Sequence, residues 1–299
     1  MRRKDRVAVR LLRLWFATVS RVAPKVAERH AANLFLTPRK PRRMKSTASP
    51  PRQLIVLSSG VPIAGWIWGK GPAVLLVHGW SGRAMDMACI GEQLAKAGYR
   101  AIAFDMPAHG ATPGKRSSLG EWVNVLPALA AECGELHAII GHSLGAATVV
   151  LALEAGLQAK GAVLFAPPLG PGYFIRRLQQ FIGLPEKRRG GMERQLALKV
   201  GREMAYFDSA RAAASLTIPA LIVHDPGDRE VPWEHAEAIN RTWRGSRLVA
   251  ATGLGHLRIL RSPEFLMQAR NFVNGLDQSG EKGSVDGWQA SCQSLDWAY

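Results

Sequence analysis

The chain has 299 residues, of which 47% are hydrophobic, and this length and apolar content are enough to bury a large core as one domain. Its formal net charge is +16 at pH 7, but residues 1–52 hold 15 Lys or Arg against two acidic residues, whereas residues 53–299 hold 24 against 21. The body of the protein is therefore nearly neutral, which argues against a nucleic-acid-binding body and assigns the basicity to an N-terminal arm.

Residues 1–52 predict a basic amphipathic helix followed by a Pro-rich linker that runs from Thr37 to Pro51. Two interpretations of the helix stay open. Its segment 1–25 lies on an anionic membrane surface with Trp15 and Phe16 among the acyl chains, or it packs its apolar stripe on the domain. Nucleic-acid binding is less favoured, because basic runs are usually only solvated. On a helical wheel one side carries Arg2, Arg3, Arg6, Arg10, Arg13 and Arg21, and the other carries Leu11, Leu12, Trp15, Phe16, Val19 and Val22.

Strands and helices alternate over residues 53–277, the predicted main domain. The segments 53–58 and 62–69 carry β-forming residues around a Ser-Ser-Gly turn, which predicts an antiparallel pair. Continuous apolar strands separated by helical segments predict a mostly parallel eight-stranded sheet with helices on both faces, an α/β fold. The other strands are expected at residues 73–78, 100–105, 136–141, 160–166, 219–224 and 246–250, and the helices at 84–97, 119–132, 143–156, 233–243 and 263–274.

One interval, about residues 167–216, is longer than a simple crossover between strands needs. It follows the sixth strand and contains helix-period stretches with Tyr173, Phe174 and Phe181. We expect a helical cap over the strand ends, because long insertions of this kind are often lids. The polar residues 278–299 predict a disordered tail.

The run Gly141-His142-Ser143-Leu144-Gly145 follows an apolar strand and opens a helix rich in small residues. A Gly-x-Ser-x-Gly turn holds its serine in strained backbone geometry so that the hydroxyl projects above the sheet. The positions around the serine must be small, because a Cβ there would collide with neighbouring backbone. Ser143 is therefore a candidate nucleophile.

A serine hydroxyl needs a base, and the base needs an orienting carboxylate. The segment Gly253-Leu254-Gly255-His256 follows the last strand and places His256 in a glycine-flanked loop. Two candidate acids, Asp225 and Asp228, follow the strand 219–224. The chain order is serine, acid, histidine, each at the carboxyl end of a strand, where side chains can converge.

Together these motifs resemble the α/β-hydrolase fold superfamily, over about residues 53–275. The resemblance implies that Asp228 is the acid, since the family's acid lies three residues before the Val of a Val-Pro pair. It also implies that the backbone N–H groups of Trp80 and Leu144 form an oxyanion hole, and that His78, His109 and His142 are structural. The matching segments are His-Gly-Trp at 78–80, Phe-Asp-Met-Pro-Ala-His-Gly at 104–110, the serine turn, Gly-Asp-Arg-Glu-Val-Pro at 227–232 and Gly-Leu-Gly-His at 253–256.

The sequence thus predicts a serine esterase or lipase-like hydrolase that cleaves a small-molecule acyl ester through an acyl-enzyme, with Ser143, Asp228 and His256 as its triad. Two alternatives stay open: a thioesterase or other acyl hydrolase with the same triad, and a non-catalytic binding protein on the same fold. No cofactor is implied. No metal site is expected either, because paired cysteines and a His-Glu-x-x-His motif are missing from the sequence. Nothing in the sequence indicates an oligomeric state.

The three cysteines, Cys89, Cys133 and Cys292, are widely spaced and odd in number, which favours a reducing compartment over a disulfide framework. The N-terminus begins with basic residues, as a secretory signal does, but Arg10 and Arg13 interrupt the apolar run behind them. No apolar stretch reaches the roughly 20 residues of a membrane span. We therefore expect a cytoplasmic protein, with the inner face of the membrane as the site of any peripheral association.

Overall fold

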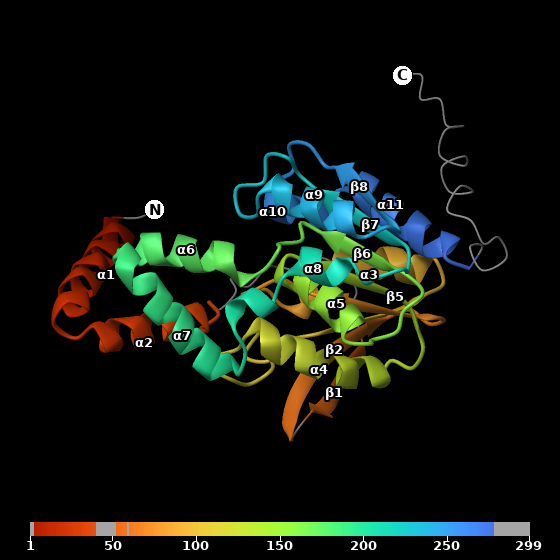
Figure 1. The fold of residues 1–299 in the computed structure, drawn as a ribbon. Helices are drawn as coiled ribbons and strands as arrows, with labels where there is room; N and C mark the ends of the chain where they lie inside the picture. Colours follow the sequence, from red (N-terminus) through yellow and green to blue (C-terminus); the bar gives the residue numbers. More distant parts are fainter. Residues whose placement is uncertain (1–2, 40–51, 59, 278–299) are drawn as a thin grey trace.

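The computed structural model describes residues 3–39, 52–58 and 60–277. A single sheet with helices on both faces forms the body, and a helical layer lies beside it (Figure 1). Most of the predicted linker and the whole predicted tail at 278–299 lie outside the described residues.

The sheet has eight strands in the order β1-β2-β4-β3-β5-β6-β7-β8. Strand β2 pairs antiparallel with both β1 and β4, and every other pair of neighbours is parallel. This confirms the predicted mostly parallel eight-stranded sheet. The strands are β1 Arg52–Ser58, β2 Val61–Trp68, β3 Ala73–Val77, β4 Arg100–Phe104, β5 Leu136–His142, β6 Ala162–Phe165, β7 Ala220–His224 and β8 Ser246–Ala250.

The central strands are buried on both sides, as their continuous apolar sequences require. In β3, Leu75 and Val77 point into the apolar cluster on one face, whereas Val74 and Leu76 point into the cluster on the other. Successive side chains of a strand alternate between the faces, so both faces need a helical cover. One face is covered by α4 Leu119–Ala131, α5 Leu144–Glu154, α8 Ser209–Ala213 and α9 Trp233–Thr242, and the other by η1 Ala84–Met87, α3 Ala88–Lys96, η4 Ile259–Arg261 and α11 Pro263–Gly275.

A helical cap follows β6, as the length of the interval predicts. It has its own apolar cluster, in which Ile175 and Ile182 of one helix meet Met192 and Leu196 of the next. The cap consists of α6 Pro171–Ile182, η2 Glu186–Arg188, α7 Arg189–Val200 and η3 Met204–Tyr206.

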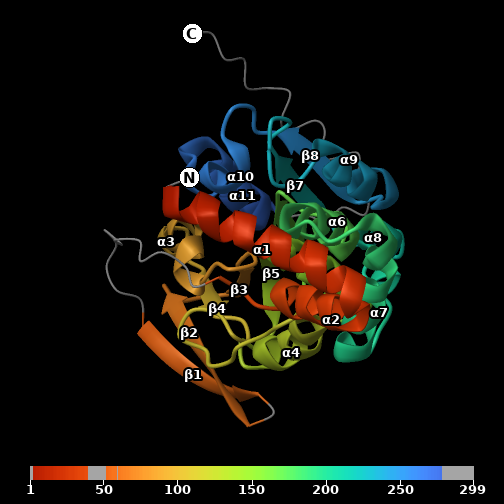
Figure 2. The same ribbon diagram turned by 90° about the vertical axis from the view of Figure 1, so that its left-hand side faces the viewer.

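The N-terminal arm forms two helices, α1 Arg3–Val22 and α2 Pro24–Phe35, which pack on the cap. Phe16 of α1 is 1% exposed and lies in the same cluster as the cap residue Ile175. Figure 2 shows α1 crossing in front of the molecule, with α2 beside α7. The arm therefore packs on the domain, which is the second of the two interpretations of the helix.

The sequence-based picture of the arm was wrong in two respects. A second helix begins at Pro24. Proline suits the first helical turn, because an N–H there would have no acceptor within the helix. In addition, the predicted apolar side of α1 is divided: Leu12, Phe16 and Val19 face the cap, whereas Leu11 and Val22 are exposed.

Candidate active site

Ser143 stands in the turn between β5 and α5, with φ 53° and ψ −124°. A positive φ is uncommon for a residue with a side chain and marks local strain. The Ser143 N–H donates to the carbonyl of Phe165 in β6, at 2.9 Å, which anchors the turn to the sheet. The sequence therefore forms the strained serine turn that its glycines predict.

Two glycines make this turn possible. A Cβ on Gly145 would lie 2.3 Å from the carbonyl oxygen of Val77, and one on Gly141 would lie 2.6 Å from Cα of Ala146. Both contacts are with backbone, which cannot rotate away. The helix can thus begin directly beside the end of β3.

Asp228 and His256 form a hydrogen-bonded pair. The His256 Nδ1 lies 2.7 Å from Asp228 Oδ2, and the Asp228 side chain is fully buried. Because an ionised carboxylate only accepts, Nδ1 carries the proton and Nε2 of the neutral ring is left as the acceptor. This is the tautomer that a general base needs.

Several donors keep Asp228 ionised. Burial alone would raise its pKa, but the adjacent His224 ring, the hydrogen bond from His256 and the backbone N–H of Glu230 together outweigh burial. The pKa of Asp228 therefore lies far below its ordinary value. The His224 ring, whose Nε2 is 3.6 Å from Oδ2, is fully buried beside the pair.

The second candidate acid, Asp225, has a different task. Its carboxylate accepts the N–H groups of Gly227, at 2.7 Å, and of Gly255, so it joins the loop after β7 to the loop that carries the histidine. The geometry therefore pairs Asp228, not Asp225, with His256.

A further contact joins the histidine loop to the serine turn. His142, the residue before Ser143, donates from Nε2 to the carbonyl oxygen of His256 at 2.9 Å. Their ring centroids are 4.8 Å apart. Burial lowers the pKa of His142 to about 3, so its ring is neutral and serves as a positioning group. The structure thus brings Ser143, His256 and Asp228 to one edge of the sheet.

The loop after β3 lies against the serine turn. A Cβ on Gly79 would lie 3.1 Å from Cβ of Ser143, so the two segments touch. Trp80 follows Gly79, and Leu144 is the first residue of α5, where a helical N–H has no intrahelical acceptor. Within the described residues neither of these two N–H groups donates to a protein acceptor. Both therefore stay candidates for the predicted oxyanion hole.

Two buried histidines hold this loop in place. His78 donates from Nδ1 to the carbonyl of Gly79 at 2.7 Å and accepts the N–H of Met106 on Nε2 at 3.0 Å. His109 accepts the N–H of Ser81 on Nε2 at 3.0 Å and donates from Nδ1 to the carbonyl of Pro107. Burial lowers the pKa of His78 to about 3 and that of His109 to about 4. Both rings therefore stay neutral, and their contacts are structural.

The N-terminal arm also reaches this loop, which the sequence did not predict. The N–H of Arg39 donates to Ser81 Oγ at 2.9 Å, and Leu36 accepts the N–H of Ser117 at 2.8 Å. Ser81 has φ 60°, a strained value for a serine. No sequence motif signals this contact, because it joins residues 42 positions apart through backbone geometry.

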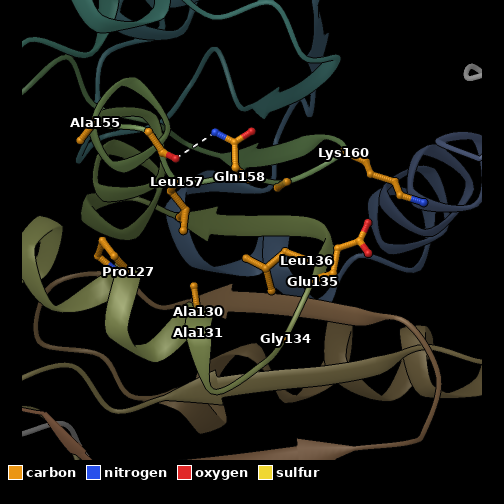
Figure 3. A pocket seen from close by; sticks show the side chains of 12 residues that line it. Pro127, Ala130, Ala131, Gly134, Glu135, Leu136, Ala155, Leu157, Gln158 and Lys160 are labelled. Carbon is orange, nitrogen blue, oxygen red and sulfur yellow. Dashed lines mark hydrogen bonds between the residues drawn. The ribbon is translucent and has the colours of Figure 1, made fainter.

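A cavity of about 570 Å³ lies elsewhere, at the amino ends of β5 and β6 (Figure 3). Leu136 and Lys160 line it, together with the end of α4 and the α5–β6 connection. The candidate residues lie at the carboxyl ends of the strands, so this cavity is not their substrate pocket. Among the described residues, no group of His, Cys, Asp and Glu side chains is arranged to hold a metal ion.

Comparisons with known proteins agree with this architecture. The model of the alpha/beta hydrolase family matches residues 74–269. Est1E from Butyrivibrio proteoclasticus is similar with a TM-score of 0.61 and 17% identity, over 77% of this chain and 100% of that one. An esterase from Pyrococcus furiosus is similar with a TM-score of 0.61 and 20% identity, over 79% and 98%. The thioesterase domain from the curacin biosynthetic pathway is similar with a TM-score of 0.56 and 17% identity, over 75% and 99%.

At these identities, the solved structures show a common fold alone. A serine hydrolase-like protein of Dictyostelium discoideum is 34% identical over 104 residues, which are 31% of this chain and 28% of that protein. The match thus spans less than a third of that relative. The family model, by contrast, extends from β3 to α11 and includes the serine turn and the histidine loop. This chain belongs to the alpha/beta hydrolase family.

Proposed function

We propose that the protein is a serine hydrolase that cleaves carboxylic esters of small molecules. The observation that carries the proposal is the hydrogen bond from His256 Nδ1 to the buried Asp228, at 2.7 Å, on a loop tied to the residue before Ser143. This pair leaves Nε2 as the basic nitrogen of His256, with the exposed Glu230 carboxylate 4.0 Å away, at the edge where the strained serine stands. A protein that only binds has no need for such a tautomer.

The reaction follows from these positions. The Ser143 hydroxyl attacks the ester carbonyl while His256 Nε2 takes its proton, and Asp228 stabilises the imidazolium that forms. The backbone N–H groups of Trp80 and Leu144 donate to the oxyanion. The imidazolium then protonates the leaving alkoxide, and a water molecule, activated by the same nitrogen, releases the acid from the acyl-enzyme.

An ester is favoured over an amide because an alkoxide leaves more readily than an amine does. An apolar acyl group is favoured by half-buried side chains from four segments that follow β3, β5 and β6 or belong to the cap. Trp80, Leu144, Leu169 and Met204 each pack on the main apolar cluster. Trp80 lies in the loop after β3, and Leu144 is the first residue of α5. Leu169 lies between β6 and the cap, and Met204 belongs to the cap.

The test is hydrolysis of p-nitrophenyl esters of increasing chain length, with Ser143→Ala as control and a fluorophosphonate probe followed by intact mass. We expect turnover and a single covalent adduct in the natural protein, and neither in the variant. An acyl-thioester series run in parallel distinguishes a thioesterase, which would label but prefer the thioester. A folded protein that neither labels nor turns over would refute the proposal and favour a binding protein.

A further inference from the structure

An uncovered apolar stripe runs along α1 on the side away from the cap. Val7, Leu11, Leu14 and Val22 recur at the spacing of one helical face. Their exposed fractions are 52%, 61%, 64% and 79%, and Trp15 at the border is 38% exposed. The opposite face, with Phe16, is buried against the cap, so docking of the helix leaves this stripe in contact with water. Exposed apolar patches of this kind mark interaction sites.

Arginines border the stripe along one flank. Arg6, Arg10, Arg13 and Arg21 are all exposed. None of them takes part in an ion pair within the described part of the chain, although Arg13 donates to the carbonyl of Phe181 and Arg21 to that of Ala17. Glu28 of α2, a buried acid of the arm, pairs with Arg188 of the cap instead. The flank therefore presents positive charge that no acidic side chain neutralises within the described residues.

An exposed aromatic residue of the cap lies beside the arginine flank. Phe181, near the end of α6, is 39% exposed and lies where Arg13 crosses that helix, since Arg13 Nε is 2.8 Å from its carbonyl. In Figure 2, α1 is the outermost element of this side and crosses the molecule from the α10 side to the α7 side. The cap helix α6 lies next to it.

We propose that this face of α1 binds the surface of an anionic lipid bilayer, with Leu11 and Leu14 among the acyl chains and the arginines at the phosphates. A helix that has apolar side chains on one stripe, tryptophan at its border and arginine beside it is suited to lie in the headgroup region. The helix binds while it remains packed on the cap. Within the described residues no helix is long and apolar enough to cross a membrane, and the proposal needs none.

Charge complementarity favours a lipid surface over a second copy of the chain. A twofold contact through this stripe would bring the same arginines of two copies together, and like charges repel. An anionic surface instead neutralises the arginines while the apolar side chains leave water. The proposal stands apart from the ester chemistry and is tested separately from it.

The test is co-sedimentation of the full-length protein with vesicles of phosphatidylglycerol and phosphatidylcholine, against vesicles of phosphatidylcholine alone. We expect binding to the anionic vesicles, weakened by salt. The variant Leu11→Glu/Leu14→Glu should bind on the order of 100-fold more weakly, because two leucine side chains no longer enter the lipid. Replacing Arg6 and Arg10 by Gln should weaken binding to the anionic vesicles by about fivefold for each arginine.

The matched control is Ile55→Glu/Leu57→Glu, which places the same charges on equally exposed apolar residues of β1, 67% and 74% exposed. It should bind as the natural protein does. Thermal unfolding of each variant reports its folding without relying on enzyme activity. Equal sedimentation of the natural protein and the α1 variant, or no sedimentation of either, would overturn the proposal. The proposal would also be overturned if the natural protein did not bind vesicles but formed a dimer in sedimentation velocity that the α1 substitutions abolish.

Discussion

Asp228 uses its two carboxylate oxygens for different purposes. Oδ1 accepts the N–H groups of Glu230 at 2.7 Å and Val231 at 3.3 Å, which shapes the loop after β7. Oδ2 accepts the proton of His256 Nδ1. The side chain that fixes the loop therefore also fixes the ring, and its position is set before any substrate arrives.

We expect Asp228→Asn to lower kcat by about 10³–10⁴, because an amide favours the wrong tautomer of His256. The paired variant Asp225→Asn keeps one acceptor oxygen for the loop and leaves the His256 partner in place. The factor by which Asp225→Asn lowers kcat should be at least tenfold smaller. Steady-state ester hydrolysis with both variants checks this, and equal losses would contradict the assignment of Asp228.

We expect that Gly145 cannot be replaced by alanine without a large loss of stability, whereas another helical glycine, Gly172, can. Gly145→Ala places a methyl group against two backbone carbonyls, those of Val77 at 2.3 Å and His78 at 2.4 Å, and should cost about 3 kcal/mol or more in unfolding free energy. Gly172→Ala in α6 meets no atom within 4 Å and should be neutral or stabilising, by up to about 1 kcal/mol. Urea unfolding of both variants measures the difference, and similar values would refute the steric argument.

The positions of Ser143 and His256 could be predicted because each follows a buried strand within a short glycine pattern. The choice of Asp228 over Asp225 needed a family resemblance, since both acids follow the same strand. The Ser81 contact with Arg39 could not be predicted at all. It depends on where the arm runs after α2, which the sequence around either residue does not specify.

At the scale of elements, α2 packs closely against α7 through one glycine. A Cβ on Gly191 would lie 2.1 Å from the carboxyl carbon of Glu28, a residue that is only 8% exposed. Arg188 Nη1 lies 3.8 Å from the same carboxylate. The acid is thus enclosed between the two helices, and the missing side chain of Gly191 provides its space.

Gly191→Ala should therefore loosen the N-terminal helices from the cap. Displacing Glu28 should cost about 1–2 kcal/mol, whereas Gly190→Ala, whose nearest atom is the mobile Arg194 Nη1 at 3.6 Å, should gain up to about 1 kcal/mol. Limited trypsin digestion at the arginines of α1, alongside urea unfolding, reports the difference. In a Glu28→Ala background the Gly191 penalty should vanish, and its persistence there would exclude Glu28 as the cause.

The elements themselves could be predicted where periodicity and length agree. Strand β8 begins and ends at the expected residues, and α9 differs by one residue. The division of α1 into a buried and an exposed apolar face was not predictable, because hydrophobicity alone does not tell which leucine meets a partner. Tertiary contact with α2 and α6 decides that.

At the scale of the whole molecule, buried neutral histidines link stability to pH. Burial lowers the pKa of His78 and His142 to about 3 and that of His109 to about 4, against about 6.5 in an unfolded chain. The unfolded state therefore binds more protons below pH 6.5, and stability is lost as the pH falls. Asp105, whose pKa burial raises to about 6, acts in the opposite direction and offsets part of the loss.

We expect the unfolding free energy to fall by about 3 kcal/mol between about pH 7.5 and pH 5.5, which is the net effect of three histidines and one aspartate. Urea unfolding at both values measures it. His109→Gln can keep one donor and one acceptor without titrating, and should reduce the fall by about 1.4 kcal/mol. Stability that stays level over this range would show that the rings are not buried as described.

The cap shares one apolar cluster with the arm at residues 3–39, although the two segments are far apart in the chain. Removing the arm would uncover Ile175, Ile182, Met192 and Leu196. Deleting the first 45 residues would therefore disturb the cap as well as any membrane contact. Point substitutions on the exposed stripe separate the two effects, which a deletion cannot.

This separation in the chain also sets the order in which the cluster is assembled during synthesis. Helix α1 leaves the ribosome long before α6 and α7, its partners, have been made, and at about 5–20 residues per second the delay is roughly 10–30 s. Throughout that interval the face that carries Phe16 has only α2 to cover it, and lacks the cap residues Ile175 and Ile182. A nascent chain of this protein therefore exposes apolar side chains on both sides of α1. Once the cap is complete, only the outer stripe stays exposed.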